Sequence, residues 1–154
     1  MASLKLAIIN ARKYARDDNI EMLKNLQSIH GNEIFKVKED TKDSCILGAG
    51  PKATRFLLEL GVDPTLENYK GENAISYAAK YIKNKDHYDA LKVLAEVNTV
   101  ARELIEEYDM KIKEEMKKVD PIVKLQQDVD LIHIKLDEIL RLFQIHTNIH
   151  HDKV

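Results

Sequence analysis

Four histidines near the end of the 154-residue chain are the first candidates for chemistry: His133, His146, His150 and His151. His146 and His150 stand at the i, i+4 spacing with which two imidazoles on one helix face can bind Zn²⁺. No carboxylate or thiolate is placed to complete such a site unless Asp152 or a second chain supplies one. The cluster therefore favours a polar, fraying helix end, and we expect no metal and no cofactor.

Cys45 is the only cysteine, which excludes an internal disulfide and a zinc site built on several thiolates. A nucleophilic cysteine needs a base and a lowered pKa, and its sequence neighbours provide neither. The stretch from Gly48 to Lys52 is too short for a phosphate-binding loop. No ordered set of serine, histidine and aspartate is present, so we predict that the protein is not an enzyme.

The amino-acid composition limits the kinds of molecule that the protein is expected to bind. The net charge is -2, with 44% hydrophobic and 32% charged residues, so no basic surplus points to nucleic acid. No run approaches the ~18 apolar residues of a membrane span. Residues 1–10 lack the long apolar segment of a signal peptide. We expect a cytoplasmic protein whose partner is another protein, with no nucleic acid and no membrane span.

The distribution of glycine and proline divides the chain into two parts with different expected structure. All five glycines lie within residues 1–71, whereas residues 72–154 contain no glycine and one proline, Pro121. Apolar residues recur at helical spacing through most of the chain. This pattern predicts an all-α protein with short helices over residues 1–96 and long helices over residues 97–154. Residues 34–38 alternate as an extended segment would.

The most specific string runs from Arg55 to Thr65. Its apolar helix face ends at Gly61, which suits the left-handed position after a helix, and Asp63-Pro64 forces a turn. A second turn glycine, Gly71, precedes a helix of small residues that Asn73 is able to cap.

This arrangement resembles the ankyrin repeat, with about three degenerate units over residues 4–96. Gly71, Ile75 and Ala78-Ala79 match the family pattern, as does the Leu57-Leu58 junction with Gly61-Val62-Asp63. Asn73, Ala74 and Ser76 replace the usual Thr, Pro and His, and these substitutions remove the hydrogen-bonded cap that is usual in the family. The resemblance implies outer helices near 19–28, 52–60 and 86–96, and inner helices near 4–16, 44–49 and 73–83. An irregular helical bundle is the alternative.

The resemblance also implies a protein partner on the concave face, with these contact residues: Glu67, Asn68, Tyr69, Lys70, Asn73 and Tyr77. Tyr69 is the leading candidate because exposed aromatic residues at loop tips are frequent binding hot spots; alternatively, it packs across its own turn. Degenerate repeats rich in Lys, Ile and Asn resemble those of bacterial effectors delivered into host cells, which implies action on host proteins.

The last third of the chain contains a heptad seam with alternating spacings of three and four residues: Ile122, Leu125, Val129, Ile132, Leu136, Ile139 and Phe143. We expect an antiparallel hairpin that turns at Asp120-Pro121. The facing stripe would be Val97, Ala101, Leu104, Tyr108, Ile112, Met116 and Val119. Ile132 and Leu136 should then be buried, either within the chain or in a homodimer. An oligomeric scaffold that self-associates through this coiled coil is the alternative function.

Overall fold

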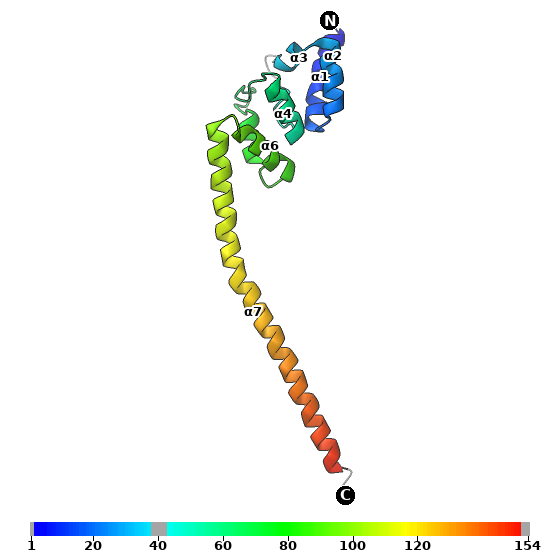
Figure 1. Ribbon diagram of the computed structural model, residues 1–154, viewed down its shortest axis with the longest axis vertical. Coiled ribbons are helices and arrows are strands. Elements are labelled where there is room, and N and C mark those ends of the chain that lie inside the picture. Colours follow the sequence, from blue (N-terminus) through cyan, green and yellow to red (C-terminus); the bar gives the residue numbers. More distant parts are fainter. Residues whose placement is uncertain (1, 38–42, 152–154) are drawn as a thin grey trace. The chain divides into compact units, whose positions relative to one another are not determined.

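The computed structural model describes the backbone of residues 2–37 and 43–151, and the side chains of residues 4–37 and 43–144. Over these ranges it contains helices and no strands, which confirms the predicted all-α class (Figure 1). The helices are α1 (Ala2–Arg16), α2 (Ile20–His30), α3 (Glu33–Lys36), α4 (Pro51–Glu59), α5 (Ala74–Lys80), α6 (Lys85–Ala95) and α7 (Thr99–His151). None of the described helices has the length and apolarity needed to cross a membrane.

The chain forms two compact units, Met1–Tyr108 and Asp109–Val154. The boundary lies inside α7, later than the division expected after residue 96. The first turns of α7 belong to the first unit because Ala101 is fully buried there and the Tyr108 ring lies 5.8 Å from that of Tyr88.

Packing in the first unit follows helix pairs. α1 packs against α2, and α6 packs against both α4 and α5. Fully buried alanines, among them Ala11 and Ala15 of α1 and Ala53 of α4, allow the helices to approach closely. Each pair also contributes a fully buried leucine: Leu23, Leu57 and Leu91. Small residues at the contacts and large ones between them produce one continuous core.

Most of the helices over residues 1–96 lie where the sequence predicts them. The helices expected near 19–28, 52–60 and 86–96 are found as α2, α4 and α6, and those expected near 4–16 and 73–83 are found as α1 and α5. Residues 45–48 form turns instead of the helix expected near 44–49. Ala49 N–H donates to the Ile46 carbonyl at 3.2 Å, and Gly48 has a φ of +75°, which stops a helix from continuing.

The expected extended segment over residues 34–38 is wrong where the structure describes it, because residues 33–36 form α3. Ile34 and Phe35 are adjacent and both buried, and a strand with one buried face would expose one of them. The Phe35 ring packs edge-on against Phe56 at 6.1 Å. Lys38 lies outside the described residues.

Gly61 ends α4 as predicted. Its φ is +78°, its N–H donates to the Leu58 carbonyl at 3.0 Å, and Val62 N–H donates to the Leu57 carbonyl at 3.0 Å. This pair of bonds is a Schellman motif, which satisfies carbonyls that the helix leaves without partners. Val62 is buried beyond the turn, so the motif also directs the chain back into the core.

The start of α4 is capped by a residue from the end of α1. Asp18 has a φ of +53°, and its Oδ1 accepts a 2.7 Å hydrogen bond from Ala53 N–H. Gly50 N–H donates to the Ala15 carbonyl at 2.9 Å. A Cβ on Gly50 would lie only 2.5 Å from the Asp18 Cβ, so glycine is required for this approach. The carboxylate also suits the positive end of the α4 dipole.

The expected hairpin turn at Asp120-Pro121 is wrong because α7 continues through both residues. Pro121 removes one N–H from the helix and leaves the Lys117 carbonyl without its usual donor. Residues 117 and 121 are both exposed, so water can solvate that carbonyl. Strong helical pattern on both sides of the proline therefore overrides its tendency to break the helix.

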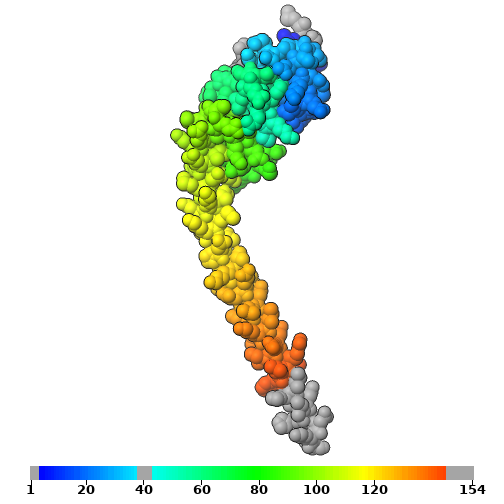
Figure 2. Space-filling view, viewed as in Figure 1, coloured from blue at the N-terminus to red at the C-terminus, as the bar shows by residue number. Residues whose placement is uncertain are grey.

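The seam and its expected partner stripe consequently lie on one helix and cannot face each other. Every residue from 111 to 144 is exposed, as the yellow-to-orange region of Figure 2 shows from one side. Ile132 is 56% exposed and Leu136 is 50% exposed. Burial of the seam within this chain is therefore wrong, and the homodimer stays a prediction.

Candidate partner-binding site

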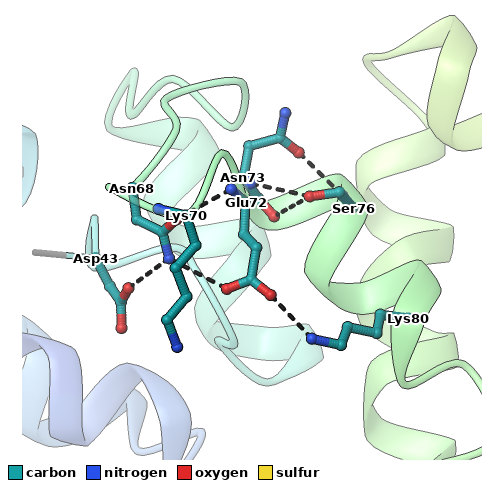
Figure 3. A network of polar contacts seen from close by, with 7 residues as sticks. All are labelled: Asp43, Asn68, Lys70, Glu72, Asn73, Ser76 and Lys80. Carbon is teal, nitrogen blue, oxygen red and sulfur yellow. Dashed lines mark hydrogen bonds and ion pairs between the residues drawn. The ribbon is translucent and has the colours of Figure 1, made fainter.

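Asn68 organises the loop between α4 and α5. Its side chain is almost fully buried, and its Oδ1 accepts hydrogen bonds from Lys70 N–H at 2.9 Å and from Glu72 N–H at 3.0 Å. Its Nδ2 donates to Asp43 Oδ1 at 2.9 Å and to Glu72 Oε2 at 3.3 Å (Figure 3). A short polar side chain that satisfies backbone groups of its own loop fixes the shape of the turn.

One ion pair ties this loop to α5, and a second ties Asp43, the partner of Asn68 in the segment before α4, to α1. Arg16 at the end of α1 lies 2.6 Å from Asp43, and Lys80 at the end of α5 lies 3.0 Å from Glu72 (Figure 3 shows the second). The hydrogen bond from Lys80, followed by that from Asn68, lowers the pKa of Glu72 below its ordinary value. The same bond and charge raise the pKa of Lys80. Glu72 therefore remains ionised and the loop stays attached to α5.

The first turn of α5 has a complete cap, and Asn73 is its N-cap residue as predicted. Asn73 Oδ1 accepts from Ile75 N–H at 3.1 Å and from Ser76 N–H at 2.9 Å. Ser76 Oγ in turn accepts from Asn73 N–H at 3.0 Å. Asn73 and Ser76 thus form a reciprocal capping box.

Aromatic side chains gather beside this loop. Tyr69, at the loop tip, is 70% exposed, and the Lys70 ammonium lies 5.5 Å from its ring centre. The rings of Tyr77 and Tyr81 are 4.8 Å apart, and His87 lies 5.7 Å from each of them. Of the two placements expected for Tyr69, the structure shows the exposed one.

A pocket of about 330 Å³ opens between the loop, α1 and α5. Its lining consists of Arg16, Asp43, Leu47, Asn68, Tyr69, Lys70, Glu72, Tyr77, Lys80 and Tyr81. We call this set the tyrosine pocket. Its charges are mixed, with three cationic side chains and two carboxylates. The pocket therefore suits a polar partner surface that presents both signs of charge.

Four of the six expected contact residues line the tyrosine pocket: Asn68, Tyr69, Lys70 and Tyr77. Glu67 is exposed outside the lining, and the Asn73 side chain is used in the cap. Sequence reasoning missed Arg16 and Asp43, which are separated by 27 positions and carry no local signal. Tyr81 could have been found, because it follows α5 directly and stands four residues after Tyr77, a spacing that brings side chains together at the end of a helix.

A second hollow, of about 430 Å³, lies among α2, α4 and α6 and was not predicted. Its lining consists of Ile20, Lys24, Pro51, Lys52, Arg55, Phe56, Glu59 and Val93. Arg55 makes two hydrogen bonds to Glu96, at 2.7 and 2.8 Å. This hollow has an apolar floor and a largely basic rim.

The candidates for catalysis lie elsewhere. Burial raises the pKa of Cys45 to about 12, and its thiol donates to the Phe35 carbonyl at 2.9 Å. The thiol is therefore protonated near neutral pH and is a poor nucleophile. His133 is exposed on α7, whereas the side chains of His146, His150 and His151 lie outside the described residues. No group of three potential metal ligands occurs among the side chains that are described.

No protein-family model matches this chain, and searches of curated proteins and of solved structures found no match.

Proposed function

We propose that the first unit is a non-catalytic protein–protein interaction module that binds its partner at the tyrosine pocket. The exposure of Tyr69 on a loop held by buried Asn68 carries this proposal. A loop already fixed by hydrogen bonds loses little conformational entropy on binding. Tyrosine supplies a large contact area and a hydroxyl, the combination common at binding hot spots.

The side chains next to Tyr69 also favour this surface as the partner-binding site. Tyr77 and Tyr81 extend the aromatic surface next to Tyr69, and Lys70 and Lys80 add hydrogen-bond donors at its edge. In the ankyrin family, to which the sequence bears resemblance, loop tips and inner helices form the partner surface. The resemblance to bacterial effectors makes host-cell proteins the first class of partner to test.

The test compares capture of proteins from a eukaryotic cell lysate by the full chain and by two variants. Tyr69→Ala should weaken capture of a specific partner by about 30-fold, equivalent to the ~2 kcal/mol of a hot spot. Ile29→Ala is the matched control, because Ile29 is also 70% exposed but lies on α2 outside the tyrosine pocket. Equal capture by the two variants would contradict the proposal.

The second candidate function is an oligomeric scaffold built through α7. The observation that favours it is the exposure of all seven seam residues in the single chain. Sedimentation of the full chain, compared with a chain truncated after Val119, tests it. Dimers of the full chain and monomers of the truncated chain are expected, whereas two monomeric species would exclude the scaffold.

A further inference from the structure

The second unit presents an apolar seam whose side chains are exposed where the structure describes them. The seven seam residues are between 39% and 70% exposed. Their spacing averages 3.5 residues, which keeps them on one side of a supercoiled helix. Burial of large apolar side chains is the main driving force of association, and a heptad seam is complementary to another heptad seam. The most economical occupant is a second copy of α7.

The seam residues pair best when two copies run antiparallel. In that orientation each a position lies opposite a d position of the other helix. With Val129 opposite Ile132 of the second copy, six of the eight layers match residue types, and in the two end layers Phe143 lies opposite Lys118. β-Branched residues face each other in the layers Val129–Ile132 and Ile122–Ile139. Leucine faces leucine in the layer Leu125–Leu136. Each of these layers occurs twice in the dimer.

The residues that flank the seam support the same register. Asp128 and Lys135 occupy g positions, and antiparallel pairing brings Asp128 of each copy next to Lys135 of the other. Leu140 and Leu142, which lie outside the seam and are each 60% exposed, come next to Val119 and Pro121. Opposite charges therefore meet, and apolar flanking residues meet apolar partners.

Other ways of pairing the two helices do not match the flanking charges and apolar residues in this way. Shifting the antiparallel register by one heptad places Lys135 against Lys135 or Asp128 against Asp128, and like charges at these positions destabilise a coiled coil. Parallel, in-register pairing places Leu140 next to Lys135. It also sets Ile132 and Ile139 at d positions opposite themselves, where leucine suits a dimer better.

We propose that two copies of this chain pair antiparallel through residues 118–143 of α7, with Val129 of one copy opposite Ile132 of the other. This inference rests on the second candidate function and is independent of the tyrosine pocket. The resulting interface is isologous, because each layer is repeated by the two-fold axis.

The first experiment measures the mass of the full chain in solution by sedimentation equilibrium. The wild type should be a dimer. Ile132→Asn should shift the dissociation constant at least 100-fold toward monomer, because the variant places two amides near the centre of the seam. Ile134→Asn is the matched control, because Ile134 is 63% exposed and lies on the opposite side of the helix from the seam. Circular dichroism of both variants verifies that the first unit remains folded.

The second experiment reads orientation by disulfide trapping under mild oxidation. Cys45 is buried and does not compete. In the proposed register, Leu125→Cys alone should not form cross-links, because its two copies lie about 16 Å apart along the coil, too far for a disulfide. The double variant Leu125→Cys/Leu136→Cys should form covalent dimers.

The third experiment exchanges charges. Asp128→Lys and Lys135→Asp should each weaken the dimer several-fold, and the double variant should restore it.

A monomeric wild type would overturn both the scaffold function and this inference. Cross-linking of Leu125→Cys alone, or a double charge variant that remains weak, would overturn the antiparallel register while leaving the scaffold function intact. A tetramer would overturn the two-stranded arrangement.

Discussion

Gly61 and Asn68 each set a stretch of backbone by a different physical means. Gly61 supplies a left-handed conformation that side-chain-bearing residues adopt only at a cost, and Asn68 supplies hydrogen bonds that a turn lacks. Only the first could be predicted from the sequence, because a glycine after an apolar helix face is a local signal. The partners of Asn68 depend on a fold that brings Asp43 to it.

Replacing Gly61 by alanine should destabilise the first unit by roughly 1 kcal/mol, the cost of placing a Cβ in the left-handed region. No clash adds to this cost, because the nearest atom, the Lys36 Cε, would lie 4.0 Å from the new Cβ. Urea denaturation followed by circular dichroism measures the change. Glu59→Ala, at an exposed position two residues earlier, should alter stability by less than ~0.5 kcal/mol. Equal stability of the wild type and Gly61→Ala would contradict this assignment.

At the scale of elements, the attachment of the loop to α5 depends on the charge of Glu72. Its pKa is lowered from the ordinary 4.5 in the folded chain, chiefly by the hydrogen bond from Lys80. A lowered pKa contributes stability that is present above pH 4.5 and is lost as the pH falls through the folded-state value. The loop should therefore loosen in acid.

Glu72→Gln tests this dependence. The variant should be less stable than the wild type at neutral pH, and the difference should shrink as the pH falls below 4.5. Denaturation curves at a series of pH values measure the gap. Glu67→Gln, in the same loop but exposed outside the tyrosine pocket, should match the wild type throughout. A gap for Glu72→Gln that does not change with pH would contradict the ion-pair explanation.

Elements with strong periodicity could be predicted, whereas their ends and connections could be predicted only in part. α2, α4 and α6 follow from apolar spacing and their terminal residues. α3 was missed because four residues are too few to show a helical period. The predicted hairpin is wrong because an exposed helix can continue through Pro121 and leave one carbonyl to water.

At the scale of the whole molecule, the proposed dimer predicts that stability depends on protein concentration. Dimerisation stabilises the folded helix by mass action. The unfolding midpoint of the second unit should therefore rise with concentration in the wild type. Ile132→Asp should abolish that rise and cost several kcal/mol at high concentration, because it places charges in the seam. Thermal melts over a 100-fold concentration range make the comparison.

Asp137→Ala is the control for this measurement, because Asp137 lies on the outer side of the helix. It should retain the concentration dependence and change stability by at most ~0.5 kcal/mol. Similar behaviour of the two variants would show that the heptad register is wrong. The sequence revealed the seam through its spacing, but whether a second chain covers it is an intermolecular question that helix periodicity cannot answer.

The cap that Asp18 provides for α4 has a consequence for the order of folding. Ala53 lies 35 positions after Asp18, so the first turn of α4 obtains its acceptor only after the chain has closed a long loop. Until then α4 is a helix of nine residues, too short to persist alone in water. The α1–α2 pair should therefore assemble first and serve as the template on which α4 forms. Refolding of an Asp18→Ala chain would then be slowed at this docking step, even though the residue belongs to neither the start nor the interior of the helix that it stabilises.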